Sequence, residues 1–216
     1  MVAGVLADAV HVLDPKNGQL VRSIGSSDAV YVLDPRNGQL VRSSGSSSRA
    51  PLQFGAPCGV CVTRDNSIIV ADFGYSRLQE IANLGRDGDV RVLGEGVLWK
   101  PQAVSLTAAE DALIVLEDLR QILVLTRDAT CVLRVLLDVA GLPEVRISSF
   151  AVCNDVVAAA RVDTVVLLDL HGKWKRNVSG EPLSDLTGTA VDSRGHVWVS
   201  VAGCFVGLLS QGEGVT

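Results

Sequence analysis

Two cysteines and three histidines are the residues with the clearest potential for metal or redox chemistry. Cys58 and Cys61 have the spacing of half a zinc site or of a redox pair, and the histidines are His11, His171 and His196. A structural zinc site takes four ligands, but no second Cys-x-x-Cys or His pair is present. Residues three apart on a strand also point to opposite faces. We therefore predict strand cysteines, surface or strand-edge histidines, and neither a metal nor a cofactor.

Aspartates that follow or flank apolar runs are the second group with chemical potential. Such carboxylates commonly accept hydrogen bonds in turns, and they are also ligands for hard metal ions. They stand at unlike strand positions, namely Asp14, Asp34, Asp72, Asp118, Asp169 and Asp192. This dispersion favours turn hydrogen bonds over a metal site. No Gly-x-Ser-x-Gly elbow, phosphate-binding glycine loop or zinc-protease motif is present, so we expect no enzyme.

Composition and charge restrict the partners. Hydrophobic residues make up 48% of the 216 residues, and the formal net charge is −5. Asp, Glu or Arg interrupts every apolar run before the roughly 18 residues that a membrane helix needs. Nucleic-acid binding depends on clustered Lys and Arg, so this charge argues against DNA and leaves RNA only through a local basic patch. The first residues lack the basic region of a secretory signal. We expect a cytoplasmic protein that contacts neither DNA nor a membrane.

The elements that position these residues are most clearly seen in residues 57–81. Val60 and Val62 alternate with small or polar neighbours, and a polar turn follows at residues 65–67. A β-branched run then ends at Asp72, and Gly74 permits the next turn. This pattern predicts a meander of adjacent antiparallel strands.

At these residues the chain closely resembles an NHL repeat, which is the unit of a class of β-propellers. The matching residues are Pro57, Gly59 and Val60, the turn residue Asp65, the run Val70, Ala71 and Asp72, and then Gly74, Arg77, Leu78 and Gln79. The family usually has Asn where this chain has Tyr75. The match is strongest over residues 51–94. The resemblance implies an all-β, NHL-like β-propeller of four-stranded antiparallel blades.

Weaker copies of this unit follow along the chain. Pro101 stands 44 residues after Pro57, which is the spacing of a propeller blade. The leucine-rich residues 113–137 are compatible with a helix by composition, but polar breaks spaced as turns favour strands. We expect blades with strands at 59–64, 67–73, 77–82 and 89–94, at 101–104, 112–117, 121–126 and 131–137, at 149–153, 156–162, 164–170 and 173–179, and at 187–192, 196–201 and 204–210. The last blade lacks its outermost strand.

The N-terminus contains a tandem duplication. Residues 8–27 and 28–47 are identical at 17 of 20 positions, and each copy predicts a hairpin with a Pro and Asn-Gly turn. We divide the chain into duplicated hairpins at 1–48, which resemble outer blade strands, and propeller blades at 49–216. A flexible linker is expected at 44–50. The whole would be a small or incomplete propeller of about four to five blades, whose last blade pairs with the second hairpin.

The resemblance also implies a function. NHL proteins often act as protein-interaction or RNA-binding modules, in several cases attached to a RING-type ubiquitin ligase. This chain contains no RING, so we expect a non-catalytic binding or scaffold module that contacts a protein partner, with substrate recognition for a ubiquitin ligase as one such role. The alternatives are an RNA-binding NHL propeller, and a metal-dependent hydrolase or lyase on a lactonase-like propeller.

Five residues are candidates for contacting a partner: Tyr75, Arg77, Trp174, Lys175 and Arg176. Arg77 is expected to pair with an acid or a carbonyl within or between blades, or else to contact a ligand. Tyr75 is expected either to anchor a partner or to cover the strand below. Trp174 belongs to a basic run that suits RNA, or to a solvated edge strand. Packing between blades is a further expectation for Trp99, Trp174 and Trp198.

Overall fold

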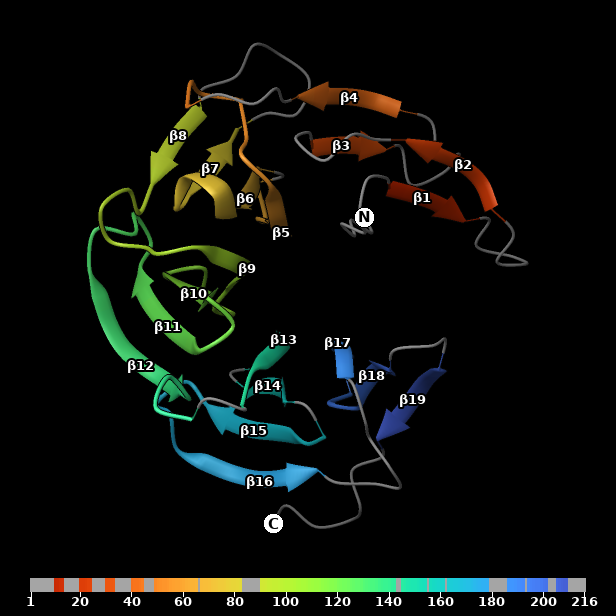
Figure 1. Cartoon of the computed structure of the whole chain (residues 1–216), viewed down its shortest axis with the longest axis vertical. Helices are drawn as coiled ribbons and strands as arrows, with labels where there is room; N and C mark the ends of the chain where they lie inside the picture. The colour runs from red at the N-terminus through yellow and green to blue at the C-terminus, as the bar shows by residue number, and fades with distance from the viewer. Residues whose placement is uncertain are drawn as a thin grey trace. The chain divides into compact units, whose positions relative to one another are not determined.

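The computed structural model describes residues 10–13, 20–24, 30–33, 40–44, 49–65, 67–82, 90–142, 145–154, 156–161, 163–178, 186–192, 194–201 and 205–209. The regular elements in these ranges are strands, apart from one short 3-10 helix, and none is an α-helix (Figure 1). None of them forms a helix long and apolar enough to cross a bilayer. The predicted all-β class is therefore confirmed.

The chain divides into two compact units, Met1–Val104 and Ser105–Thr216. The division that the sequence predicted, between residues 48 and 49, stays a prediction. The same holds for the proposed pairing of the last blade with an N-terminal hairpin.

The duplicated segment forms two antiparallel hairpins with the same register. The first pairs β1 (Val10–Leu13) with β2 (Leu20–Ile24), and the second pairs β3 (Val30–Leu33) with β4 (Leu40–Ser44). In both hairpins the register of pairing shifts at the same place, between the last two residues of the first strand. The predicted hairpins are confirmed, whereas their turns lie outside the described residues.

The first four-stranded sheet has the order β5-β6-β7-β8. Its strands are β5 (Pro57–Val62), β6 (Ile68–Asp72), β7 (Arg77–Ile81) and β8 (Val90–Leu93). The short helix η1 (Phe73–Tyr75) connects β6 to β7. Every residue of β6 and β7 is buried, because both faces of these inner strands are covered. Part of the core is a cluster of Phe54, Ile68, Val70 and Ile81.

The next sheet has the order β12-β11-β10-β9. Its strands are β9 (Pro101–Leu106), β10 (Ala112–Glu117), β11 (Gln121–Thr126) and β12 (Val132–Asp138). The leucine-rich residues 113–137 thus form strands rather than a helix, as the polar breaks predicted. Leucines and valines fill β10 and β11, which are the buried inner strands.

Two further sheets belong to the second unit. The first is β13 (Ile147–Cys153), β14 (Val156–Arg161), β15 (Val165–Asp169) and β16 (Trp174–Val178), and the second is β17 (Leu186–Val191), β18 (Val197–Val201) and β19 (Phe205–Leu209). A shared cluster includes Ala158, Leu167, Leu186 and Val199, so these sheets pack on each other. In the described residues the last sheet has three strands.

Two glycines of the NHL-like pattern lie where backbone segments touch. A Cβ atom on Gly59 would lie 2.5 Å from the Cα of Ala103 and 2.7 Å from the carbonyl oxygen of Gln102. A Cβ on Gly74 would lie 1.5 Å from the carbonyl oxygen of Gly55. The left-handed residue of this turn is instead Ser76, with φ 54°. A glycine is therefore required at position 74 because the backbone of Gly55 approaches it closely, and not because this residue has a positive φ.

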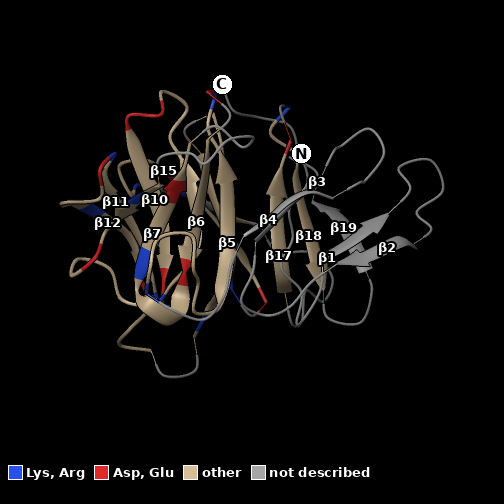
Figure 2. Cartoon of the chain, turned by 90° about the horizontal axis from the view of Figure 1, so that it is seen from above, with Lys and Arg blue, Asp and Glu red and all other residues tan. Residues whose placement is uncertain are grey.

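Two of the predicted turn aspartates, Asp169 and Asp192, accept hydrogen bonds in turns, whereas Asp14 and Asp34 lie outside the described residues. Asp169 accepts from the amides of His171 and Lys173, and Asp192 accepts from the amides of Arg194 and His196. Many of the acidic and basic residues lie at strand ends and in turns (Figure 2). The carboxylates of Asp169 and Asp192 thus fix the turns between strands.

The turn between β11 and β12 gives a prediction about acidity. Hydrogen bonds from the Thr126 and Thr130 side chains, at 2.6 and 2.8 Å, hold the pKa of Asp128 at about 2. Because this pKa lies below the unfolded value of about 3.9, the turn is stabilised above pH 4, and this contribution is lost as the pH falls towards 2. Thr126→Val should therefore raise the Asp128 pKa in an NMR titration. Thr187→Val, which removes a distant hydroxyl bonded to Ser200, should leave it unchanged. An unmodified protein whose Asp128 titrates near pH 4 would contradict the assignment.

Candidate functional site

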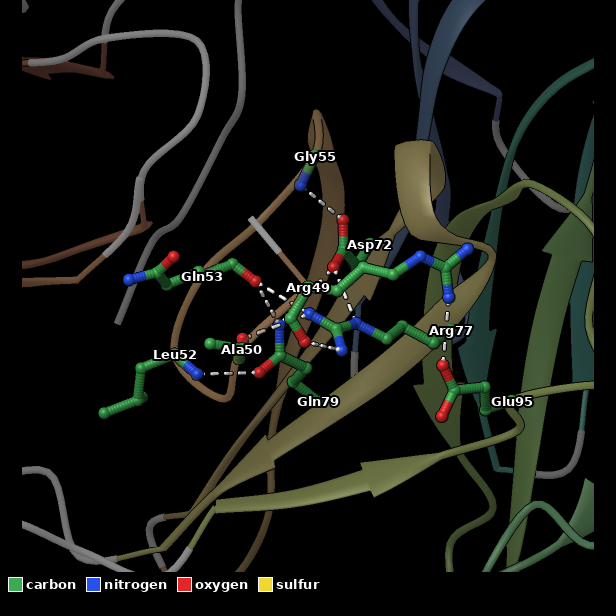
Figure 3. A network of polar contacts seen from close by, with 9 residues as sticks. All are labelled: Arg49, Ala50, Leu52, Gln53, Gly55, Asp72, Arg77, Gln79 and Glu95. Atoms are coloured by element: carbon green, nitrogen blue, oxygen red, sulfur yellow. Dashed lines mark hydrogen bonds and ion pairs between the residues drawn. The ribbon is translucent and has the colours of Figure 1, made fainter. Parts of the chain in front are cut away.

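Arg77 is the centre of a buried polar network in the first unit. It is the first residue of β7 and lies opposite Asp72, the last residue of β6. Its Nε donates to Asp72 Oδ2 at 3.0 Å, with side-chain exposures of 2% and 0% (Figure 3). The remaining guanidinium nitrogens donate to backbone carbonyls of Arg49 at 2.7 Å, Ala50 at 3.3 Å and Gln53 at 2.9 Å. The internal pairing considered for Arg77 is therefore what the structure shows.

Two further side chains complete this network. Gln79 donates through Nε2 to the carbonyl of Gln53 at 2.7 Å and accepts from the amide of Leu52 at 2.9 Å. Asp72 Oδ1 accepts from the amide of Gly55 at 2.8 Å (Figure 3). The Asp, Arg and Gln of the NHL-like pattern thus bind the backbone of residues 49–55. The flexible linker expected at 44–50 is wrong for Arg49 and Ala50, whose carbonyls are held, and residues 45–48 lie outside the described residues.

Tyr75 lies between two guanidinium groups. Its ring centroid is 5.4 Å from the Arg49 Cζ and 5.3 Å from the Arg77 Cζ, which is the distance of a cation–π contact. The ring also packs against Gly55, where a Cβ would approach it to 2.8 Å. Tyr75 is half-buried and covers the network, although the contact with a partner stays a prediction.

Cys58 and Cys61 are both half-buried on β5. Burial raises the pKa of the Cys58 thiol above its ordinary value, and the negative charge of Asp72 raises it further. The thiolate is the form that binds metal and attacks electrophiles. Cys58 is accordingly held in its unreactive form at neutral pH.

An exposed aromatic surface lies beside η1. Its centre is the exposed Trp99 with the half-buried Phe73 and Lys100. Val97 is exposed two positions before Trp99 in the same connecting segment, and we call these four residues the Trp99 surface. The Trp99 side chain is 61% exposed and Val97 is 38% exposed. The Lys100 Nζ lies 5.5 Å from the centroid of the Trp99 ring and 5.7 Å from that of Phe73. Sequence reasoning missed Phe73 and Lys100 here.

The prediction that Trp99 and Trp198 pack between blades is wrong. Trp198 is 38% exposed on β18, and Trp99 follows β8 in a connecting segment rather than in an inner strand. The sequence signal for an exposed Trp99 was the Trp-Lys pair at 99–100, because the same pair at 174–175 is a candidate for contacting a partner.

Trp174 and Lys175 lie in the second unit, on β16 at the edge of its sheet (Figure 1). Trp174 is 59% exposed, its Nε1 donates to Asn177 Oδ1 at 3.2 Å, and Lys175 is also exposed. Arg176 lies opposite Leu167 in the strand register. The solvated edge strand is therefore confirmed for Trp174, while a partner contact stays a prediction.

The described histidines lie apart from each other. His171 is exposed and its Nδ1 is 2.7 Å from an Arg134 Nη1, whereas His196 Nδ1 is 2.8 Å from Asp192 Oδ2. Among the described residues, no three His, Cys, Asp or Glu side chains are grouped as a metal ion would require. The side chain of His11 lies outside the description.

Comparison with known proteins identifies a fold. No family model and no curated protein matches the sequence. Virginiamycin B lyase from Staphylococcus aureus matches the structure with a TM-score of 0.66 at 12% identity, over 95% of this chain and 75% of that one. The nidogen/laminin complex matches with 0.63 at 14% identity, over 91% and 68%. The WD40 β-propeller domain of Doa1 matches with 0.61 at 15% identity, over 82% and 56%.

These likenesses and the four-stranded antiparallel sheets define the class of this protein. It has a β-propeller fold, as the sequence predicted. Propellers serve both as enzymes and as binding modules, so the fold does not decide the function.

Proposed function

We propose that this chain is a non-catalytic protein-binding module built from NHL-type repeats. The observation that carries this proposal is the presence of two large, exposed tryptophans, Trp99 at 61% and Trp174 at 59%. Tryptophan is enriched among the residues that dominate the energy of protein interfaces. Burial of each ring against a partner would remove apolar surface from water and so contribute favourable free energy to binding.

The NHL assignment is supported by the contacts of the pattern residues. Asp72, Arg77 and Gln79 hold the segment that leads into β5, and Gly59 allows β5 to touch β9. The polar residues Asp72, Arg77 and Gln79 and the glycines Gly59 and Gly74 of the pattern thus have a physical role in this chain. Within that family, substrate recognition for a ubiquitin ligase in the cytoplasm is the finer function that we propose.

One structural neighbour supports a protein partner. It was solved as a nidogen/laminin complex, and its propeller-like fold resembles this chain with a TM-score of 0.63. The likeness concerns the fold and does not transfer that partner.

The experiment is affinity capture from cytosol with the full chain as bait, with and without ribonuclease. We expect a discrete protein that survives ribonuclease and binds again when both proteins are purified. The bait with Trp99→Ala and Trp174→Ala should lose at least about 10-fold in affinity, the effect of truncating interface anchors. Capture that disappears with ribonuclease would contradict the proposal.

RNA binding is the second candidate, and one observation favours it. Trp174 and Lys175 are neighbours on the same edge strand and both are exposed; an exposed aromatic ring can stack a base, and a lysine can contact a phosphate. In that case oligonucleotide binding should fall with Trp174→Ala and with rising salt.

A hydrolase or lyase is the remaining alternative, suggested by the likeness to virginiamycin B lyase. An inactive variant of that lyase was solved with quinupristin. Cleavage of quinupristin by the purified chain with an added divalent metal ion would establish this alternative and overturn the non-catalytic proposal.

A further inference from the structure

We propose that the Trp99 surface docks an acidic peptide segment of the partner protein. Lys100 would bind a carboxylate of that segment, and Trp99 with Val97 would cover an adjacent apolar side chain. This inference rests on the proposed protein-binding function and adds to it the site and the chemistry of the ligand.

Lys100 is held in an unusual conformation. Its backbone has φ 49°, which is the left-handed region that residues other than glycine rarely adopt. Its amide donates to Ser76 Oγ at 3.2 Å, and its ammonium group lies over the rings of Phe73 and Trp99. Nine described non-glycine residues have a positive φ, so it is the contacts with Ser76, Phe73 and Trp99, rather than the φ alone, that distinguish Lys100.

The charge of Lys100 is uncompensated within the described part of the chain. Arg77 pairs with Asp72, and Arg49 pairs with Glu95 at 3.1 Å. By contrast, no carboxylate of the described residues lies within ion-pair distance of Lys100, whose ammonium contacts are the two aromatic rings. A carboxylate brought by the partner would therefore complete this site by charge complementarity.

The apolar part of the surface adjoins this cation. Trp99 is 61% exposed and Val97 is 38% exposed, two positions apart in the same connecting segment. An exposed ring beside a positioned charge is the combination that anchors a short peptide. The ligand should accordingly contain an acidic residue next to an apolar or aromatic one.

A peptide fits this surface better than RNA does. RNA affinity comes from several phosphates neutralised together, whereas this surface offers one unpaired cation. The formal charge of the chain, −5, also opposes a polyanion. A peptide with one carboxylate and one apolar side chain needs only the groups that this surface contains, the Lys100 cation and the exposed Trp99 ring.

The test begins with selection of random displayed peptides on the immobilised full chain. We expect the recovered sequences to share Asp or Glu beside an apolar residue. A recovered peptide, synthesised with a fluorescent label, is then measured by anisotropy. Trp99→Ala should weaken it about 30-fold and Lys100→Gln about fivefold, while the amide-for-acid version of the peptide should match the loss from Lys100→Gln.

The control is the third tryptophan, which has no role in the proposed function. Trp198→Ala removes a ring that is 38% exposed on β18, and it should leave peptide affinity unchanged. Replacement of Trp174 and Trp198 by Phe leaves Trp99 as the only tryptophan. Its emission should shift to shorter wavelength when the peptide binds, which shows that folding is intact and that the ligand touches this ring.

The outcomes separate this inference from the proposed function. If peptides without acidic residues are recovered, or if Trp198→Ala weakens the peptide as much as Trp99→Ala does, the Trp99 site is wrong and the protein-binding function stands. If oligonucleotides bind the Trp99 surface more tightly than the peptide, the inference is overturned. If neither peptides nor a captured protein bind at all, both proposals fail.

Discussion

Arg77→Leu should lower the free energy of unfolding by about 3–5 kcal/mol, the range for breaking a buried ion pair by removing one partner. The loss leaves the Asp72 carboxylate buried with its charge uncompensated. It also removes the guanidinium hydrogen bonds to the carbonyls of Arg49, Ala50 and Gln53, of which the last two keep a second donor. The measurement is denaturant unfolding together with hydrogen exchange of the amides of Leu52 and Gly55. Both amides donate into the network, so their protection should fall first.

The control is Arg49→Leu, which removes an arginine from the edge of the same network. Its ion pair with Glu95 is exposed on both sides, and exposed pairs contribute about 0–1 kcal/mol. Adding Asp72→Asn to Arg77→Leu should recover part of the loss, because the buried charge is then gone. Equal effects of Arg77→Leu and Arg49→Leu would show that the buried network does not stabilise the fold.

Gly59→Ala should cost about 2–3 kcal/mol, the upper part of the range for overpacking a filled site. The new Cβ would lie 2.5 Å from the Cα of Ala103 and 2.7 Å from the carbonyl oxygen of Gln102. Both neighbours are backbone atoms of β9, so no side chain can rotate away, and β5 and β9 must separate. Thermal or denaturant unfolding measures this cost.

Gly141→Ala is the matched substitution for this prediction. Apart from its chain neighbours, no atom of the described residues lies within 4 Å of the position where its Cβ would be, so its effect should stay within about 0.5 kcal/mol. If Gly59→Ala is as mild as Gly141→Ala, the close approach of β5 to β9 is not a property of the folded protein in solution.

The positions of the strands were determined by the sequence itself. Alternating apolar residues, β-branched runs and Pro or Asn-Gly turns placed the duplicated hairpins, and polar breaks placed β10, β11 and β12 in a stretch with a helical composition. These signals are readable because strand periodicity and turn preference act between residues that are close in the chain. The glycines, Arg77 and Gln79 were likewise recognisable as members of one repeat pattern.

Tertiary structure alone decided what those residues contact. Arg77 binds carbonyls 24 to 28 positions away. Every residue has a backbone carbonyl, so the sequence does not indicate which carbonyls a side chain will bind. The exposure of Trp99 and the position of Lys100 over two rings also depend on which segments pack beside them. Burial is a property of non-local packing, so the same residue type can fill a core or remain on the surface, and only the folded arrangement distinguishes the two.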